Sequence, residues 1–372
     1  MVNLLLSINR SKDMKKLLGV LCMALSLVAC DNGDNSQSKP VVKIGASFPL
    51  SGNMASIGNA AHRALVAAID DANANKQNKY FYKLTVENDQ MEPKVINTVA
   101  NKFIYQDKVD VIISFFSGAG RIVAPMAAKN GTINFSFGYD DVVLQSKYNF
   151  QNFLTGESEN NAAIDFLQSM SVKNVDLVYQ NIGAADQLLK PLIAKLQNAG
   201  IKYDIHRFNK GETDFKVLVS KLKDSKSDAL FIYAFEPESD ILTREFRTQN
   251  LNKIIAYSDG LPMTNDYALY DGYYNVGSFV TPDNLKQKWG LDGQNAAYSA
   301  YLYDTGRIIV DAYENAESTD AIPTADAISE YLLSREDYSG VVGKYKLDKR
   351  GQFHSAGQTT VVQDGKLVPY TK

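Results

Sequence analysis

Val41-Val42-Lys43-Ile44-Gly45-Ala46 is a short and largely apolar run, and a regular apolar pattern follows it after a loop. Its length and composition predict a buried β-strand. The apolar residues that come next recur at helical spacing and form one face of a predicted helix: Ala61, Ala64, Leu65, Ala68, Ile69 and Ala72. A strand that leads into an amphipathic helix is the repeating unit of a sheet covered by helices, so residues 41–72 favour an α/β fold.

The same alternation continues along the chain in two runs. In the first run, strands are predicted at residues 82–86, 109–114 and 132–135, and helices at 93–105 and 121–129. In the second run, helices are predicted at 162–170, 188–196, 215–222 and 239–248, and strands at 175–179, 201–206, 229–233 and 253–257. Two successive runs predict two lobes, each built on a doubly wound parallel sheet with helices on both faces.

The C-terminal part of the chain has a different pattern. It predicts a long helix at residues 295–316, a shorter helix, and two strands near Val341 and Val361. In parallel sheets of this kind, ligands bind beyond the carboxyl ends of the strands. The loops at those ends are therefore the candidates for a binding site: residues 47–58, 115–120, 137–141, 180–186, 235–239 and 258–260.

The composition is that of an ordinary globular protein. Hydrophobic residues make up 45% of the 372 residues and charged residues 22%, and this length suffices for two domains. The formal net charge is only −3, which argues against a nucleic-acid partner.

The N-terminus has the features of a secretory signal. A basic region that contains Lys15 and Lys16 precedes the apolar residues 17–29, which are too few to span a bilayer as a helix. The run ends in Leu27-Val28-Ala29-Cys30, which resembles the bacterial lipobox. An ordinary signal peptide with a stray cysteine is the alternative, and Met14 is a second possible start.

The resemblance to the lipobox implies a lipoprotein. Residues 1–29 would be removed as the signal, and Cys30 would carry the lipid, palmitate included, at the outer face of the cell membrane. Residues 30–40 are polar and predict a flexible tether. Because Cys22 leaves with the signal, the mature chain keeps one cysteine and forms no internal disulfide.

The sequence contains no pattern that is typical of an enzyme. The three histidines, His62, His206 and His354, are far apart and have no metal-ligand spacing. There is no Gly-x-Ser-x-Gly motif and no phosphate-binding loop, and Gly118-Ala119-Gly120 lacks the third glycine of a dinucleotide loop. We therefore expect no catalytic residues, metal or cofactor. An enzyme with an unrecognised site is kept as an alternative.

Five short motifs occur in order between residues 41 and 372. They are Ile44-Gly45-Ala46-Ser47-Phe48-Pro49-Leu50-Ser51-Gly52 with Gly58; Glu87-Asn88-Asp89 before Pro93-Lys94; Gly211-Glu212-Thr213-Asp214-Phe215; Tyr257-Ser258-Asp259-Gly260; and Gly343-Lys344-Tyr345 with Leu347-Asp348 and Gly351. Together they resemble the type I periplasmic solute-binding proteins of ABC transporters, and above all the branched-chain amino-acid-binding (leucine/isoleucine/valine) group.

This resemblance implies two lobes joined by three hinge crossings, with ligand bound between them. Carried onto this chain, lobe one is residues 41–156 and 283–353, and lobe two is residues 157–282 and 354–372. The family delivers its ligand to an ABC permease in the inner membrane. A sensory receptor of the same fold, which presents its ligand to a signalling partner, is the alternative.

The resemblance also implies a set of binding residues. Ser117 matches the serine that binds the ligand α-carboxylate, although a serine that caps a helix is an alternative. Gly138 and Asp140 match the carbonyl and the threonine that face the ligand ammonium, and Asp140 in a local turn is the alternative. Asp259 matches the acidic residue of lobe two, with a plain turn aspartate as its alternative.

Aromatic side chains would form the walls of the site, and they depart from the family pattern. Phe116, Tyr139 and Phe235 are the candidates, and each has a core position as its alternative. Ile57 and residues 183–186 stand where the family often has aromatic residues. An amino acid is the first expectation for the ligand, and amides, urea, small peptides and aromatic or other organic acids stay open.

Overall fold

The computed structural model describes residues 39–264, 266–291, 296 and 298–370. The predicted signal segment, Cys30 and most of the predicted tether lie outside the described residues. The chain divides into residues 1–39 and residues 40–372, and both sheets belong to the second unit.

The first of two sheets has eight strands in the order β11-β12-β13-β5-β4-β3-β1-β2. Its strands are β1 (Val41–Phe48), β2 (Phe81–Asn88), β3 (Val111–Phe115), β4 (Ile133–Phe137), β5 (Asn149–Asn152), β11 (Asp337–Ser339), β12 (Lys344–Leu347) and β13 (Gln352–Ser355). The strands from β13 to β2 are parallel, whereas β12 pairs antiparallel with both β11 and β13.

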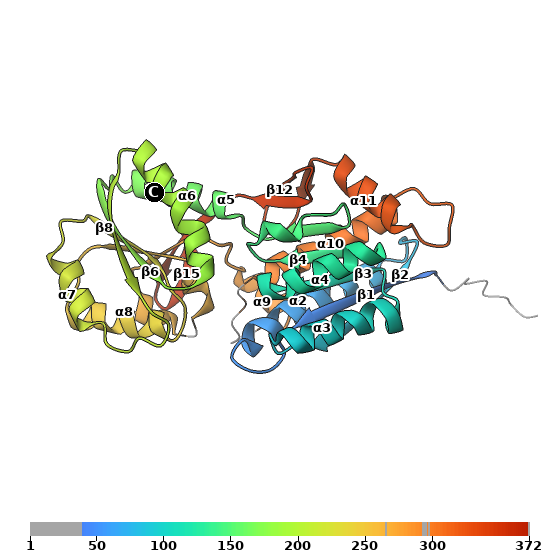
Figure 1. Cartoon of the computed structure of the whole chain (residues 1–372), viewed down its shortest axis with the longest axis horizontal. Helices are drawn as coiled ribbons and strands as arrows, with labels where there is room; N and C mark the ends of the chain where they lie inside the picture. The colour runs from blue at the N-terminus through green and yellow to red at the C-terminus, as the bar shows by residue number, and fades with distance from the viewer. Residues whose placement is uncertain (1–38, 265, 292–295, 297, 371–372) are drawn as a thin grey trace, which may run out of the picture. The chain divides into compact units, whose positions relative to one another are not determined.

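Helices cover both faces of this sheet (Figure 1). They are α2 (Ala55–Ala74), α3 (Pro93–Asn101) with its π-helical extension η1 (Lys102–Asp107), α4 (Phe116–Asn130), η2 (Asp141–Val143), α9 (Asp283–Lys288), α10 (Ser299–Asn315) and α11 (Ala325–Ser334). Val111 and Ile113 pack in the cluster that contains α2 and α10, while Ile112 packs with α3 and α4. Successive residues of a strand point to opposite faces, so the two clusters lie on opposite sides of the sheet.

The second sheet has seven strands in the order β15-β14-β10-β9-β8-β6-β7. Its strands are β6 (Asn174–Gln180), β7 (Lys202–Phe208), β8 (Ala229–Tyr233), β9 (Ile254–Ser258), β10 (Tyr274–Gly277), β14 (Gln358–Gln363) and β15 (Lys366–Pro369). Its helices are α5 (Gly156–Ser169), α6 (Gly183–Asn198), α7 (Lys216–Asp224), α8 (Glu238–Thr248), η3 (Leu261–Met263) and η4 (Tyr267–Tyr270). Leu177 and its neighbour Val178 belong to different apolar clusters, so this sheet too is covered on both faces.

The predicted fold class is confirmed, with a correction at the sheet edges. Both sheets are mixed, because β12, β14 and their partners run antiparallel. The sequence predicted two strands after the last helix, but the structure has five, and the prediction missed β5 and β10. Helices α4 and α6 begin at Phe116 and Gly183, five residues earlier than predicted in each case, since their first turns lack the apolar spacing on which the prediction rested.

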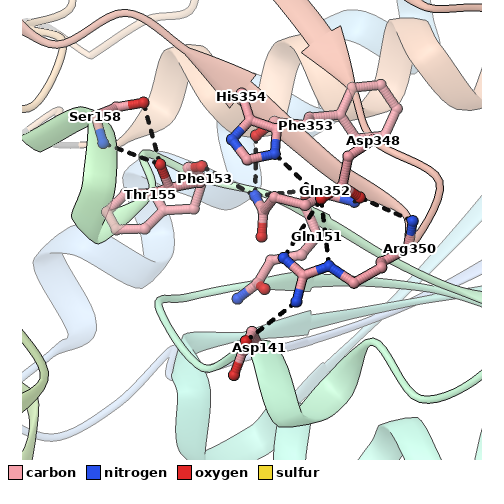
Figure 2. A network of polar contacts seen from close by, with 10 residues as sticks. All are labelled: Asp141, Gln151, Phe153, Thr155, Ser158, Asp348, Arg350, Gln352, Phe353 and His354. Atoms are coloured by element: carbon pink, nitrogen blue, oxygen red, sulfur yellow. Dashed lines mark hydrogen bonds and ion pairs between the residues drawn. The ribbon is translucent and has the colours of Figure 1, made fainter.

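Three connections join the two sheets, at residues 153–155, 278–282 and 356–357. The first and third leave the first sheet from adjacent strands, where Gln352 Nε2 donates to the carbonyls of Gln151 at 3.2 Å and Phe153 at 3.4 Å (Figure 2). Thr155 then caps α5 by accepting from the Ser158 backbone N–H at 3.1 Å. The expected lobe boundary between residues 353 and 354 falls inside β13, so the third connection lies two residues later.

Candidate functional site

A cavity of about 700 Å³ lies at the carboxyl ends of strands from both sheets. In the first sheet, its lining residues follow β1, β2, β3, β4 and β5. In the second sheet, they belong to the ends of β6 and β8 and to the loops after β6, β7, β8 and β9. This is the position at which parallel α/β sheets bind ligands, so the cavity is the candidate site.

The structure brings six of the seven sequence-predicted site residues to this cavity. They are Phe116, Ser117, Gly138, Tyr139, Phe235 and Asp259. Asp140 is not among the lining residues. Its Oδ1 accepts from the Val142 backbone N–H at 3.3 Å, and its Oδ2 pairs with Arg121 Nε. Asp140 therefore makes the local turn contact that was its alternative interpretation.

Ser117 lies in the first turn of α4, directly after β3. Its Oγ accepts a hydrogen bond from the Tyr139 backbone N–H at 3.1 Å, which leaves its own hydrogen for another acceptor. The first backbone N–H groups of α4 also have no partner within the helix. A Cβ on Gly138 would lie 2.6 Å from Ser117 Oγ, so only glycine allows the two loops to approach this closely.

Asp259 follows β9 and is almost fully buried, with 1% of its surface exposed. Ser278 donates to its Oδ1, and the Tyr139 hydroxyl contacts its Oδ2. Burial raises the pKa of Asp259, and the hydrogen bonds from Ser278 and Tyr139 act against this rise. A Cβ on Gly260 would lie 1.8 Å from the Ala234 carbonyl oxygen, so a glycine here lets the loops after β8 and β9 meet.

Glu159 is a residue of the site that the sequence did not reveal. It lies in the first turn of α5, where acidic residues are common and usually solvated. Here it is 1% exposed, and its Oε2 is 2.9 Å from the Tyr139 hydroxyl. Burial and then the charge of Asp259 raise the pKa of Glu159 well above its ordinary value. Its sequence context carries no signal of this environment, which depends on the packing of α5 against Tyr139.

Aromatic side chains dominate the walls of the cavity. Seven line it: Phe116, Phe137, Tyr139, Phe153, Tyr233, Phe235 and Tyr298. Tyr139 and Phe153 pack edge to face at 4.8 Å between ring centroids, and Phe153 packs against Tyr298 at 5.2 Å. Other positions thus supply the aromatic surface that was expected to be missing at Ile57. Four of these aromatic residues were not predicted from the sequence: Phe137, Phe153, Tyr233 and Tyr298.

The described part of the chain contains no candidate metal cluster and no candidate membrane-spanning helix. Within it, no three residues among His, Cys, Asp and Glu are grouped so that they could hold a metal ion. His206 is instead buried beside Asp176, with Nε2 3.0 Å from the carboxylate, and His354 Nε2 lies 3.3 Å from Asp348. None of the described helices has the length and apolarity needed to cross a membrane.

Comparison with known proteins identifies the class to which this fold and cavity belong. The family model described as periplasmic binding protein matches residues 41–366. The chain therefore belongs to the periplasmic binding protein family, which confirms the resemblance that the five motifs predicted. Membership implies a location outside the cytoplasm.

Particular relatives support this assignment. The chain is 28% identical over 331 residues to Leu/Ile/Val-binding protein homolog 2 of Brucella abortus, covering 83% of this chain and 87% of that protein. It is 25% identical over 368 residues to an amino acid binding protein of Pseudomonas aeruginosa, covering 94% of this chain and 96% of that protein.

Solved structures share the fold. The branched-chain amino acid transporter substrate binding protein LivJ of Streptococcus pneumoniae, in complex with isoleucine, is 19% identical with a TM-score of 0.73, covering 88% of this chain and 97% of that one. A solute binding protein of an ABC transporter from Rhodopseudomonas palustris, in complex with 4-hydroxybenzoate, is 17% identical with a TM-score of 0.75, covering 89% and 96%. At these identities the likeness concerns the fold alone.

Proposed function

We propose that this protein captures a small solute that carries both an ammonium and a carboxylate group, an amino acid, in the cavity between the two sheets. The observation that carries the proposal is the placement of opposite polar groups across one cavity. Ser117 and the first amides of α4 face it from the first sheet, and Asp259 faces it from the second.

The electrostatics of the two sides support a zwitterion. A carboxylate at the N-terminus of α4 would meet the Ser117 hydroxyl, unpaired backbone N–H groups and the positive end of the helix dipole. A buried carboxylate such as Asp259 is costly without a cation, and a ligand ammonium beside it would supply one in an environment where pairing is strong.

An aromatic acid is a second candidate, and a specific observation favours it. Seven aromatic residues line the cavity, and rings pack well against planar ligands. Proteins of the same fold have been solved with 4-hydroxybenzoate and with 3,4-dihydroxybenzoate. A benzoate, however, brings no cation to Asp259, and this is why the amino acid is preferred.

A thermal-shift screen followed by calorimetry tests the choice. The informative pair is L-phenylalanine and 3-phenylpropionate, which differ in the amino group, together with L-leucine and 4-hydroxybenzoate. A bound ligand raises the unfolding temperature by mass action. We expect L-amino acids to give the largest shifts. Binding of 4-hydroxybenzoate or 3-phenylpropionate without any amino acid would instead establish an aromatic-acid receptor.

Capture is proposed to work by closure of two lobes, residues 41–156 with 283–353 and residues 157–282 with 354–372, where the last boundary moves to the connection at residues 356–357. Ligand contacts to both lobes would favour the closed state, which an ABC permease would recognise. A receptor that passes the signal to a sensory partner would use the same closure. Permease and ATPase genes beside this gene would support transport, and a histidine kinase gene would support sensing.

We further propose that Cys30 carries the lipid that holds the receptor at the outer face of the cytoplasmic membrane. More than one acyl chain is needed for stable attachment, as lipobox cysteines receive. Asp31, next in the chain, resembles the signal for retention at the inner membrane in Gram-negative bacteria. There the tether would keep the receptor close to a permease.

Lipidation predicts a clear effect of one substitution. In a Gram-negative host grown with labelled palmitate, Cys30→Ser should abolish the label on the protein and release it from the membrane fraction. Cys22→Ser is the matched control, because that residue lies in the removed signal and should leave labelling unchanged. Label that persists in Cys30→Ser would exclude this attachment site.

A further inference from the structure

The hydroxyl of Tyr139 lies between two buried carboxyl groups. Its oxygen is 2.9 Å from Glu159 Oε2 and also contacts Asp259 Oδ2. Both acids are only 1% exposed, so water does not separate them from the phenol. A phenol carries one hydrogen and donates it to one acceptor. The second oxygen–oxygen contact therefore needs another hydrogen, which only a carboxyl group of the pair can supply.

The surroundings of the two acids decide which of them holds that hydrogen. Asp259 accepts a further hydrogen bond from Ser278 on its other oxygen. Glu159 Oε1 is buried and has no hydrogen-bond partner among the described residues. Donors stabilise a carboxylate, while a buried oxygen without a donor is far less costly on a neutral carboxyl group. The hydrogen therefore belongs on Glu159 Oε2, directed at Tyr139.

The charged and titratable groups around Glu159 come from several elements of both sheets, and they are acids and phenols. They are Asp259, Tyr139, Tyr179, Tyr233, Tyr298 and Tyr301. No lysine, arginine or histidine of the described chain contributes to the pKa of Glu159. Ionising both acids would place one negative charge on each side of the same phenol oxygen. Two carboxyl groups this close do not both ionise at neutral pH.

We propose that Glu159 is neutral in the ligand-free protein and donates its hydrogen to Tyr139, which in turn donates to Asp259. Glu159 is then a positioning residue: it fixes Asp259 as the ionised member of the pair and holds the Tyr139 hydroxyl toward it. A ligand ammonium meets one carboxylate from this pair, which matches the single positive charge of an ordinary α-amino acid. This consequence rests on the proposed function, whereas the hydrogen on Glu159 does not.

The decisive variant is Glu159→Gln, studied without ligand in the full-length protein. Glutamine keeps an N–H donor toward Tyr139 and a carbonyl in place of Oε1, but it does not titrate. Because the folded protein holds its proton more tightly than the unfolded chain, wild type loses stability as pH rises from the unfolded pKa of glutamate through the folded one. Above the unfolded pKa of glutamate, its unfolding temperature should fall relative to Glu159→Gln by about 2 °C for each pH unit until the folded carboxyl group has titrated.

Glu157→Gln is the matched control, since Glu157 is an exposed acid in the same helical turn. Its unfolding temperature should follow that of wild type at every pH. If the unfolding temperatures of wild type and Glu159→Gln changed with pH in parallel, with or without a constant difference between them, the proposal would be overturned. This result would not bear on the amino-acid screen, so the hydrogen on Glu159 and the proposed amino-acid binding can be refuted independently.

A second measurement needs no variant. The proposal places a hydrogen on the carboxyl group of the buried Glu159. The infrared spectrum of the ligand-free protein at neutral pH should therefore show a carbonyl band of a protonated carboxyl group that shifts on ¹³C labelling of glutamate. Absence of a glutamate-dependent band would overturn the proposal, even if Glu159→Gln did not fold.

Discussion

Asp259 has the backbone conformation φ 56°, in the left-handed region that aspartate and asparagine adopt more readily than most residues. Asp259→Asn therefore removes the charge while it keeps the size and the tolerance for this conformation. We expect the affinity for the amino acid with the largest thermal shift to fall by about 100-fold, because a buried ligand ammonium would lose its paired charge. Isothermal titration calorimetry measures this loss.

Glu236→Gln is the control for that substitution. Glu236 lines the same cavity but is exposed, so its charge is better solvated. Its neutralisation should change the affinity by no more than about threefold. An Asp259→Asn protein that binds the amino acid as tightly as wild type does would show that Asp259 does not pair with the ligand ammonium.

At this scale, the sequence predicts residues that lie next to recognisable strands. Ser117 and Asp259 each come soon after an apolar strand, so the rule that ligands bind at strand ends points to them. Glu159 and Tyr298 reach the same site from α5 and from the start of α10. Their positions depend on how the chain returns between the sheets, and no local pattern encodes that.

Asp140 shows that a residue at a strand end need not line the cavity. It also follows a strand, but its carboxylate caps η2 and pairs with Arg121 instead of lining the cavity. A position at a strand end thus places a residue near the site, while the direction of the side chain is set by the competing donors around it.

The last residue of β10 is a glycine with a specific packing role. Gly277 has φ 122°, and a Cβ there would lie 2.9 Å from Glu159 Cγ. Gly277→Ala should therefore combine backbone strain of roughly 1–3 kcal/mol with a clash against a buried side chain. We expect a lower urea midpoint with an unchanged slope, read by circular dichroism.

Gly343→Ala separates the two effects. Gly343 has a similar φ of 129°, but nothing lies within 4 Å of its added Cβ. This variant should therefore show the backbone cost alone and lose less stability than Gly277→Ala. Equal losses would mean that Glu159 moves away from the added methyl group, and the packing at the end of β10 would then be looser than its distances imply.

At the scale of elements, long periodic segments were predictable and short strands were not. The apolar face of α2 recurs over several turns, and Ala61, Leu65 and Ile69 are buried as expected. Strand β5 has the sequence Asn149-Phe150-Gln151-Asn152, in which three of four residues are polar although all four are buried. It forms because its neighbours β4 and β13 hydrogen-bond to it, so its sequence alone does not predict a strand.

At the scale of the whole molecule, Tyr139 links the two sheets. It follows β4 of the first sheet, and its side chain contacts the two buried acids beside the second sheet. Its ring packs on Phe153 at the first connection, and its hydroxyl contacts Glu159 and Asp259. A hydrogen bond to a charged group contributes about 1.5–3 kcal/mol. This contact is thus strong enough to shift an equilibrium between closed and open lobes by about tenfold or more.

Tyr139→Phe removes only the hydroxyl and keeps the ring in the wall. We expect the ligand-free variant to have a larger radius of gyration in small-angle X-ray scattering, since the open state gains population. Saturating ligand should restore the wild-type value, because ligand contacts replace the lost one. The apparent affinity should fall by about tenfold, as the binding-competent fraction does.

Tyr148→Phe provides the control, because the Tyr148 hydroxyl donates to Asp326 of α11 at 2.6 Å and Tyr148 packs against the apolar cluster of the first sheet. It should leave both the radius and the affinity unchanged. A Tyr139→Phe protein with the wild-type radius but weaker binding would locate the effect of the hydroxyl in the site itself. Tyr139 would then orient Asp259 for the ligand without holding the lobes together, and closure would depend on the ligand alone.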